Sequence, residues 1–252
     1  MRNTKLQLDG SDKRCALRWV MLLLGCSFGL FSLVYFTING GLTDILLSAV
    51  TIFFVFSPFL IEKLFRCRLN TAFCVFAFFY SLFPILGYSY KFYYLVPGWD
   101  KLMHFSGGVV FAVVGAYIPL LLKKEYSRDI LMRALFALMF SISISVLWEF
   151  YEFTADRLFG TDMQNDTIVY SINSYMLGSG TGVVGSIDKI ESVTVNGDAL
   201  PGYLDIGLID TMLDMMFETA GAVIYTIIFA ADRDRHPVFR RTQKIDGRSN
   251  IS

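Results

Sequence analysis

Six long apolar runs constrain the fold of this chain more than any other feature. A helix needs about 20 predominantly apolar residues to cross a bilayer, and we expect spans at roughly 17–38, 42–61, 71–88, 101–122, 130–150 and 207–231. Hydrophobic residues make up 54% of the 252 residues, which is more than soluble globular domains contain. The sequence therefore predicts an all-α, polytopic membrane protein with a bundle of six transmembrane helices.

The basic residues indicate how the chain is oriented. If both termini face the same side, all the lysines and arginines fall on that side except Lys91, Lys101, Arg157 and Lys189. Short cytoplasmic loops and ends carry an excess of Lys and Arg, so we expect both termini to be cytoplasmic. Residues 1–232 then form the transmembrane domain, and residues 233–252 form a basic cytoplasmic tail.

One long polar interval interrupts the apolar pattern, from about residue 153 to about residue 206. It is rich in Gly, Ser, Asn and Asp, and its Asn196-Gly197 pair is typical of a tight hairpin turn. Loops of this length in compact domains are usually functional or disordered. We expect an outer loop that contains a small hairpin and covers the helix ends.

Acidic residues within the last span are the strongest functional signal. Asp210, Asp214 and Glu218 are spaced four residues apart, so they lie on one side of a helix. An ionisable group at bilayer depth costs on the order of 3 kcal/mol, so such groups have partners, contact water or serve a function. With a rise of about 1.5 Å per residue, Asp214 would lie roughly 10 Å and Glu218 roughly 16 Å below the outer surface.

Two further polar pairs are expected at the same membrane face. Asp100 and His104 begin the fourth span, and Glu149 and Glu152 end the fifth, so three helix faces could converge. The candidates for catalysis are Asp100, His104, Glu149, Glu152, Asp210 and Asp214, and the candidates for metal ligation are His104, Glu149, Asp214 and Glu218.

Several of these residues also have structural interpretations. Glu149 and Glu152 could be ordinary interface charges, and Asp210 could cap its helix or lie in the first turn. Lys101 could pair with a neighbouring acid or extend to the surface. The whole set could be a structural polar network.

Two chemistries fit one histidine among several carboxylates. A divalent cation is the one cofactor that these residues suggest: oxygen ligands favour magnesium, calcium or manganese, and the imidazole admits zinc. Alternatively, closely spaced carboxylates share protons and perform acid–base chemistry or proton relay. The spacing matches no short metal motif such as His-Glu-x-x-His, and no Ser or Cys nucleophile motif is present.

Three motifs in order carry a resemblance to known families. They are Asp100-Lys101-Leu-Met-His104-Phe-Ser-Gly107, Trp148-Glu149-Phe-Tyr-Glu152, and Asp210-Thr211-Met-Leu-Asp214-Met with Gly221-Ala222. With them the chain resembles the YjdF-type bacterial inner-membrane family and, more distantly, VanZ-like proteins. The resemblance implies a small helical membrane protein of the bacterial inner membrane. VanZ-like members are associated with resistance to teicoplanin-type antibiotics, but Glu218 stands where an Asn is common in them.

Three functions fit these observations. The first is an outward-facing acidic pocket with a histidine, which binds an envelope lipid-linked, amphipathic or cationic ligand. The others are a metal- or carboxylate-dependent intramembrane hydrolase or transferase acting on envelope lipids, and a cation- or proton-coupled transporter. The expected partner is the lipid bilayer, together with an envelope lipid or amphipathic ligand, and no nucleic acid is expected.

Overall fold

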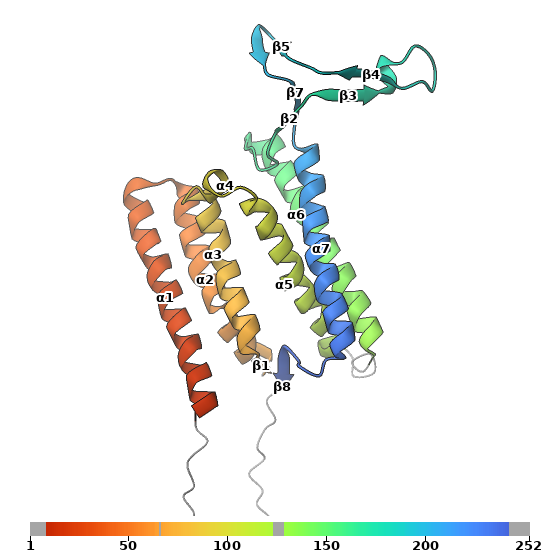
Figure 1. Ribbon diagram of the computed structural model, residues 1–252. Helices are drawn as coiled ribbons and strands as arrows, with labels where there is room; N and C mark the ends of the chain where they lie inside the picture. Colours follow the sequence, from red (N-terminus) through yellow and green to blue (C-terminus); the bar gives the residue numbers. More distant parts are fainter. Residues whose placement is uncertain (1–8, 66, 123–128, 242–252) are drawn as a thin grey trace, which may run out of the picture.

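The computed structural model describes residues 9–65, 67–122 and 129–241, which are mostly helical (Figure 1). In this part of the chain, six helices are long and apolar enough to cross a membrane, which confirms the expected helical bundle. Their bounds are α1 Asp9–Asn39, α2 Leu42–Phe65, α3 Thr71–Tyr88, α5 Trp99–Leu122, α6 Ile130–Phe159 and α7 Leu208–Asp232, and the short α4 is Phe92–Leu95.

The long helices pack as two units of three. We call α1, α2 and α3 the first unit, and α5, α6 and α7 the second unit. Within each unit every helix contacts the other two, whereas α3 and α5 make the largest contact between long helices of different units. Figure 1 shows the first unit in red to yellow and the second in green to blue. This division matters because the space between the units contains the candidate binding cavity.

Glycine allows α5 and α7 to pack with their backbones in contact. A Cβ added to Gly108 would lie 1.9 Å from the backbone oxygen of Glu218, and one added to Gly221 would lie 2.1 Å from the backbone oxygen of Phe105. Only residues without a side chain permit this approach, as at small-residue interfaces of membrane helices. The packing brings the polar residues of α5 and α7 within reach of each other.

The end of α6 differs from the expectation. The apolar run suggested an end near residue 150, but the helix continues to Phe159 and stops at Gly160, whose φ is +62°. No glycine or proline interrupts residues 151–159, so the first residue suited to a left-handed C-cap is Gly160. Glu149 and Glu152 therefore lie within the helix and are buried instead of marking its end.

A two-stranded sheet joins the units at one end of the molecule. Strand β1, Cys67–Leu69, pairs antiparallel with β8, Phe239–Arg241, so the segment after α7 crosses to the connection between α2 and α3. We call this the β1–β8 end. Beside it Arg133, which the sequence placed among the cytoplasmic charges, is only 2% exposed and lies 2.7 Å from Asp234.

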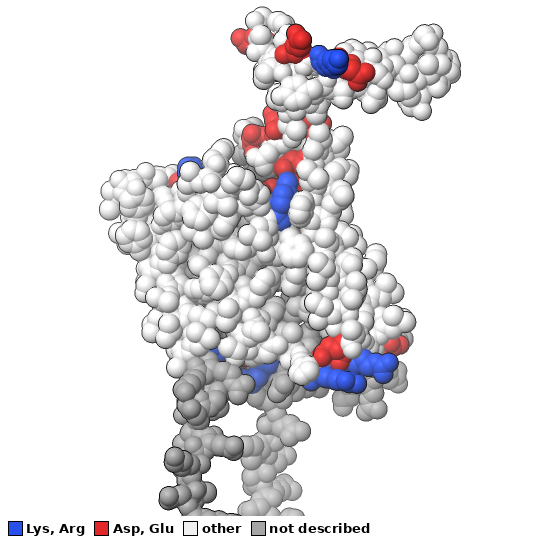
Figure 2. Space-filling model, in the orientation of Figure 1, with Lys and Arg blue, Asp and Glu red and all other residues white. Residues whose placement is uncertain are grey.

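Short hairpins project from the opposite end, which we call the loop end (Figure 1). The paired strands are β2 Thr167–Val169 with β7 Tyr203–Asp205, β3 Ser171–Ser174 with β4 Gly185–Asp188, and β5 Val193–Val195 with β6 Asp198–Leu200, and the 3-10 helix η2 is Tyr175–Leu177. Asn196 and Gly197 both have positive φ between β5 and β6, which confirms the expected hairpin turn. In Figure 2, charged side chains gather towards the two ends, and the middle of the visible face is uncharged.

Candidate functional site

Lys101 joins acidic side chains of α5 and α7 near the loop end. Its Nζ lies 3.1 Å from Asp100 Oδ2, 2.5 Å from Asp210 Oδ1 and 2.8 Å from Asp214 Oδ1. The Asp214 side chain is 1% exposed, so its contact with the ammonium is shielded from solvent. This agrees with the interpretation of Lys101 as a partner of neighbouring acids, and it extends that interpretation from one acid to three.

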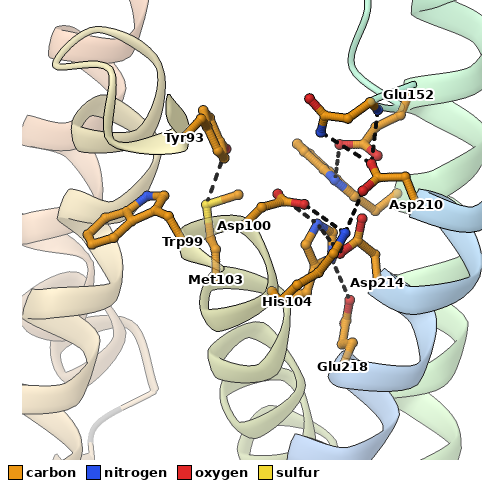
Figure 3. Close-up of polar contacts among 12 residues, drawn as sticks. Tyr93, Trp99, Asp100, Met103, His104, Glu152, Asp210, Asp214 and Glu218 are labelled. Atoms are coloured by element: carbon orange, nitrogen blue, oxygen red, sulfur yellow. Dashed lines mark hydrogen bonds and ion pairs between the residues drawn. The ribbon is translucent and has the colours of Figure 1, made fainter. Parts of the chain in front are cut away.

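His104 continues the same network one turn deeper along α5. Its Nε2 lies 3.6 Å from Asp100 Oδ1 and 3.8 Å from Asp214 Oδ1, and its Nδ1 lies 3.8 Å from Glu218 Oε2. Figure 3 shows these side chains converging between α5 and α7. We call this set the Lys101–His104 network: Asp100, Lys101, His104, Asp210, Asp214 and Glu218.

The charges of this network do not balance. Four carboxylates face two basic side chains, so acidic groups remain in excess even when His104 is protonated. Buried charges at membrane depth are unfavourable without partners, and the excess makes the region attractive to protons, cations and hydrogen-bond donors.

Glu149 and Glu152, on α6, lie beside the network but form no ion pair with it. Glu152 Oε1 accepts a hydrogen bond from Trp148 Nε1 at 2.8 Å. Glu149 is 4% exposed, and neither of its carboxylate oxygens has a hydrogen-bond partner in the described part of the chain. The structure thus brings together Asp100, His104, Asp210, Asp214 and Glu218 by direct contacts, and it places Glu149 and Glu152 outside those contacts.

The segment after α6, residues 161–165, covers the network at the loop end. Asp210 Oδ2 accepts hydrogen bonds from Asn165 N at 3.0 Å and from Asn165 Nδ2 at 3.2 Å. Asp156 holds the same segment by accepting bonds from Thr161 Oγ1 and from the backbone N of Met163 and Gln164. Asp210 therefore both contacts Lys101 and anchors the covering segment, a link that the sequence did not reveal.

Whether a metal ion can bind within this network depends on the position of the Lys101 ammonium. Asp100, His104 and Asp214 each offer a ligand atom, and these atoms lie within 4.8 Å of one another. However, the Lys101 ammonium already contacts both of these carboxylates and supplies the positive charge that a cation would bring. A divalent cation could bind here only by displacing Lys101 from the aspartates, so this arrangement does not favour a resident metal.

A cavity of about 430 Å³ lies between the two units. Among the residues that line it, His104 and Glu218 are the ones that can carry a charge. Glu218 Oε1 is buried and has no hydrogen-bond partner in the described residues. The lining residues are Phe54, Ser57, Pro58, Ile61, Phe73, Ala77, Tyr80, Ser81, Pro84, Met103, His104, Gly107, Val110, Phe111, Val114, Ile144, Trp148 and Glu218.

Aromatic side chains pack beside the loop-end part of this cavity. Tyr93, on α4, donates its hydroxyl hydrogen to Met103 Sδ at 3.6 Å, and Met103 lines the cavity. The pKa of Tyr93 is raised, first by burial and then by the Asp100 carboxylate, so its hydroxyl stays protonated as a donor. Trp99 Nε1 donates to Phe83 O at 3.3 Å, which attaches the start of α5 to α3.

Comparison with known proteins relates this architecture to a family. An uncharacterised protein of Thermotoga maritima is 32% identical over 110 residues, which are 41% of this chain and 54% of that protein. The chain thus spans about half the length of that curated relative, and no solved structure matches it. A family model described as "Predicted membrane protein (DUF2238)" matches residues 19–235, from within α1 to beyond the end of α7. Because this match covers most of the chain, including the whole Lys101–His104 network, the chain belongs to the DUF2238 family of membrane proteins.

Proposed function

We propose that this protein binds an amphipathic molecule, with the apolar tail in the cavity between the two units and the polar head at His104 and Glu218. The observation that carries the proposal is the composition of the cavity wall, which is largely apolar and has its charged residues together. Ligand sites typically combine an apolar lining with a few polar groups that orient the ligand.

The size and course of the cavity suit a hydrocarbon chain. Its volume of about 430 Å³ lies within the range of small-molecule sites, roughly 300–1,000 Å³. Its lining on α5 runs from Met103 to Val114, a length of about 16 Å along the helix. The walls from α2 and α3 are contributed mainly by apolar residues, among them Phe54 and Ala77. A tail can therefore extend along α5 while its head remains near the Lys101–His104 network.

The proposal includes an orientation in the bacterial inner membrane, which the YjdF-type resemblance supports. We place the β1–β8 end in the cytoplasm and the loop end outside. Described basic residues at the β1–β8 end include Lys63, Arg68, Arg233 and Arg235, as expected where positive charge is retained inside. The head of the ligand would then lie towards the outer surface, within reach of envelope molecules.

A cysteine at Gly180 tests this orientation. Gly180 lies at the loop end, between η2 and β4, with open space around it, so Gly180→Cys should be tolerated. In a background without the four native cysteines, a membrane-impermeant maleimide is expected to label Gly180→Cys in cells whose inner membrane is intact. Labelling that requires disruption of the inner membrane would reverse the orientation.

Filling the cavity tests the binding site. Ala77 lines the cavity, and Ala77→Trp would occupy space that the tail needs. A dodecyl amphiphile with a diazirine near the tail end is expected to label wild-type residues on α3 and α5 saturably in nanodiscs. Ala77→Trp should reduce this saturable labelling by about tenfold, the effect of losing roughly 1.4 kcal/mol of binding.

Ala72→Trp is the matched control, because Ala72 is an exposed residue of the same helix. It should label like the wild type, since ordinary lipid contacts at the helix surface do not saturate. Equal saturable labelling in Ala77→Trp and Ala72→Trp, with both variants folded, would contradict a ligand in the cavity.

Transport is less well supported than binding because an apolar layer closes the second unit below the network. The buried core of that unit consists mainly of small apolar residues: Ala112, Val113, Ala116, Ala134, Ala137 and Ala222. This layer separates Glu218 from the buried Arg133 near the β1–β8 end. A path for ions through the second unit would require these closely packed helices to separate.

A further inference from the structure

We infer that the head of the bound amphiphile is an ammonium group with N–H donors, recognised by Glu218. This inference rests on the proposed function, because it names the class of ligand that the same cavity takes. Three features of the cavity wall lead to it: an unpaired acceptor, an excess of negative charge, and aromatic rings on the same wall.

Glu218 supplies the unpaired acceptor. The residue is 4% exposed, and its two oxygens have different surroundings: Oε2 lies 3.8 Å from His104 Nδ1, whereas Oε1 has no hydrogen-bond partner in the described chain. A buried carboxylate oxygen without a donor is unfavourable. Because Glu218 lines the cavity, a ligand that places an N–H group there would remove this cost.

The charge around Glu218 favours a positive head. His104 is the basic residue in contact with Glu218, and it is also near Asp100 and Asp214. Its positive charge, when present, is therefore shared among three carboxylates. Glu149, on α6, adds another buried carboxyl group to this region. An ammonium head would offset this excess, whereas a phosphate head would be repelled by it.

Aromatic side chains that line the same cavity as Glu218 complete the match. Tyr80 and Trp148 line the same cavity, from α3 and α6 respectively. The faces of such rings attract ammonium groups within about 6 Å of the ring centre. Trp148 also donates its indole hydrogen to Glu152 at 2.8 Å, which fixes the ring on the cavity wall. The cavity wall therefore offers an ammonium both a carboxylate and aromatic rings.

Competition among amphiphiles that share a dodecyl tail tests the inference. The photoreactive dodecyl probe carries a neutral glucoside head, so that its own binding does not depend on a charge. The competitors carry ammonium, trimethylammonium, glucoside or phosphate heads. Wild-type protein in neutral-lipid nanodiscs is expected to bind the ammonium about tenfold or more tightly than the glucoside, and the phosphate most weakly. The trimethylammonium, which has the charge but no N–H donor, should fall between ammonium and glucoside.

The variant Glu218→Gln keeps the shape of the side chain and removes its charge. It should lower ammonium binding by about tenfold or more, as expected for a hydrogen bond to a charged group, and leave glucoside binding nearly unchanged. Glu191→Gln, at an exposed position between β4 and β5 at the loop end, is the matched control and should keep the wild-type order of heads.

The outcomes separate this inference from the proposed function. If the glucoside probe labels the cavity saturably but the four heads compete equally, or the phosphate competes best, the ammonium assignment is wrong and the binding site stands. An unchanged order of heads in Glu218→Gln would also overturn the assignment to Glu218. Failure of every amphiphile to give saturable labelling that Ala77→Trp reduces would overturn the binding function itself.

Discussion

Replacing Lys101 by methionine is expected to destabilise the protein by about 3 kcal/mol, the lower end of the cost of removing one partner from a buried ion pair, because the Lys101 side chain is 20% exposed. Lys101 contacts Asp100, Asp210 and Asp214, and without its ammonium these carboxylates would face one another with only His104 to offset them. Methionine keeps most of the length of the side chain, so the loss of stability reflects the missing charge more than altered packing.

Two native cysteines allow unfolding to be measured in this experiment. Cys67 and Cys74 are free and buried, so a thiol-reactive dye detects unfolding when it reaches them. The Lys101→Met midpoint of thermal unfolding should fall well below that of the wild type in the same detergent. Lys91→Met is the matched control, since Lys91 is exposed and its ammonium contacts only the Tyr88 ring among the described side-chain interactions. Equal midpoints for the two variants would contradict a central role for Lys101.

The second large effect is expected at the contact between α5 and α7. Gly108→Ala would place a Cβ 1.9 Å from the backbone oxygen of Glu218, and a backbone atom cannot rotate away as a flexible side chain can. We expect a loss of about 3 kcal/mol, at the upper end for overpacked sites. Because the clash also displaces Glu218, ammonium selectivity should fall together with stability.

Gly221→Ala gives an independent version of this test, because its Cβ would lie 2.1 Å from the backbone oxygen of Phe105 on α5. Each variant forces the same two helices apart, so the double variant should cost less than the sum of the single variants. Gly180→Ala, with open space around its Cβ, is the control and should unfold like the wild type. Strict additivity would indicate that the two glycines do not share one contact.

Much of the architecture could be predicted from the sequence because the length of an apolar run directly indicates a membrane-spanning helix. Local residues mark the break between α1 and α2 at Asn39 and Gly40, and also the start of α3. At the start of α3, the Asn70 side chain accepts a hydrogen bond from Phe73 N. The end of α6 differs from the expectation because the apolar run stops near residue 150, whereas the helix continues beyond it. In the structure Glu149 and Glu152 are buried within α6, which ends at Phe159 and has Gly160 as its C-cap.

The candidate site was predictable in part. The four-residue spacings placed Asp100 with His104 and Asp210 with Asp214 on common helix faces, and the structure brings these faces together around Lys101. The cavity could not be predicted, because its walls from α2 and α3 are apolar. In a single sequence, Phe54 or Ala77 facing a cavity is indistinguishable from the same residue facing lipid. That distinction depends on how the two units pack, which no local pattern encodes.

The most direct test of the central claim is native mass spectrometry of the protein released from nanodiscs that contain dodecylammonium. One amphiphile per chain should be retained in the wild type and in Ala72→Trp, and the bound species should be lost in Ala77→Trp, whose indole would fill the cavity beside α5. Retention of the amphiphile by Ala77→Trp at the wild-type level, or no defined bound species in the folded wild type, would contradict a binding site between the two helical units.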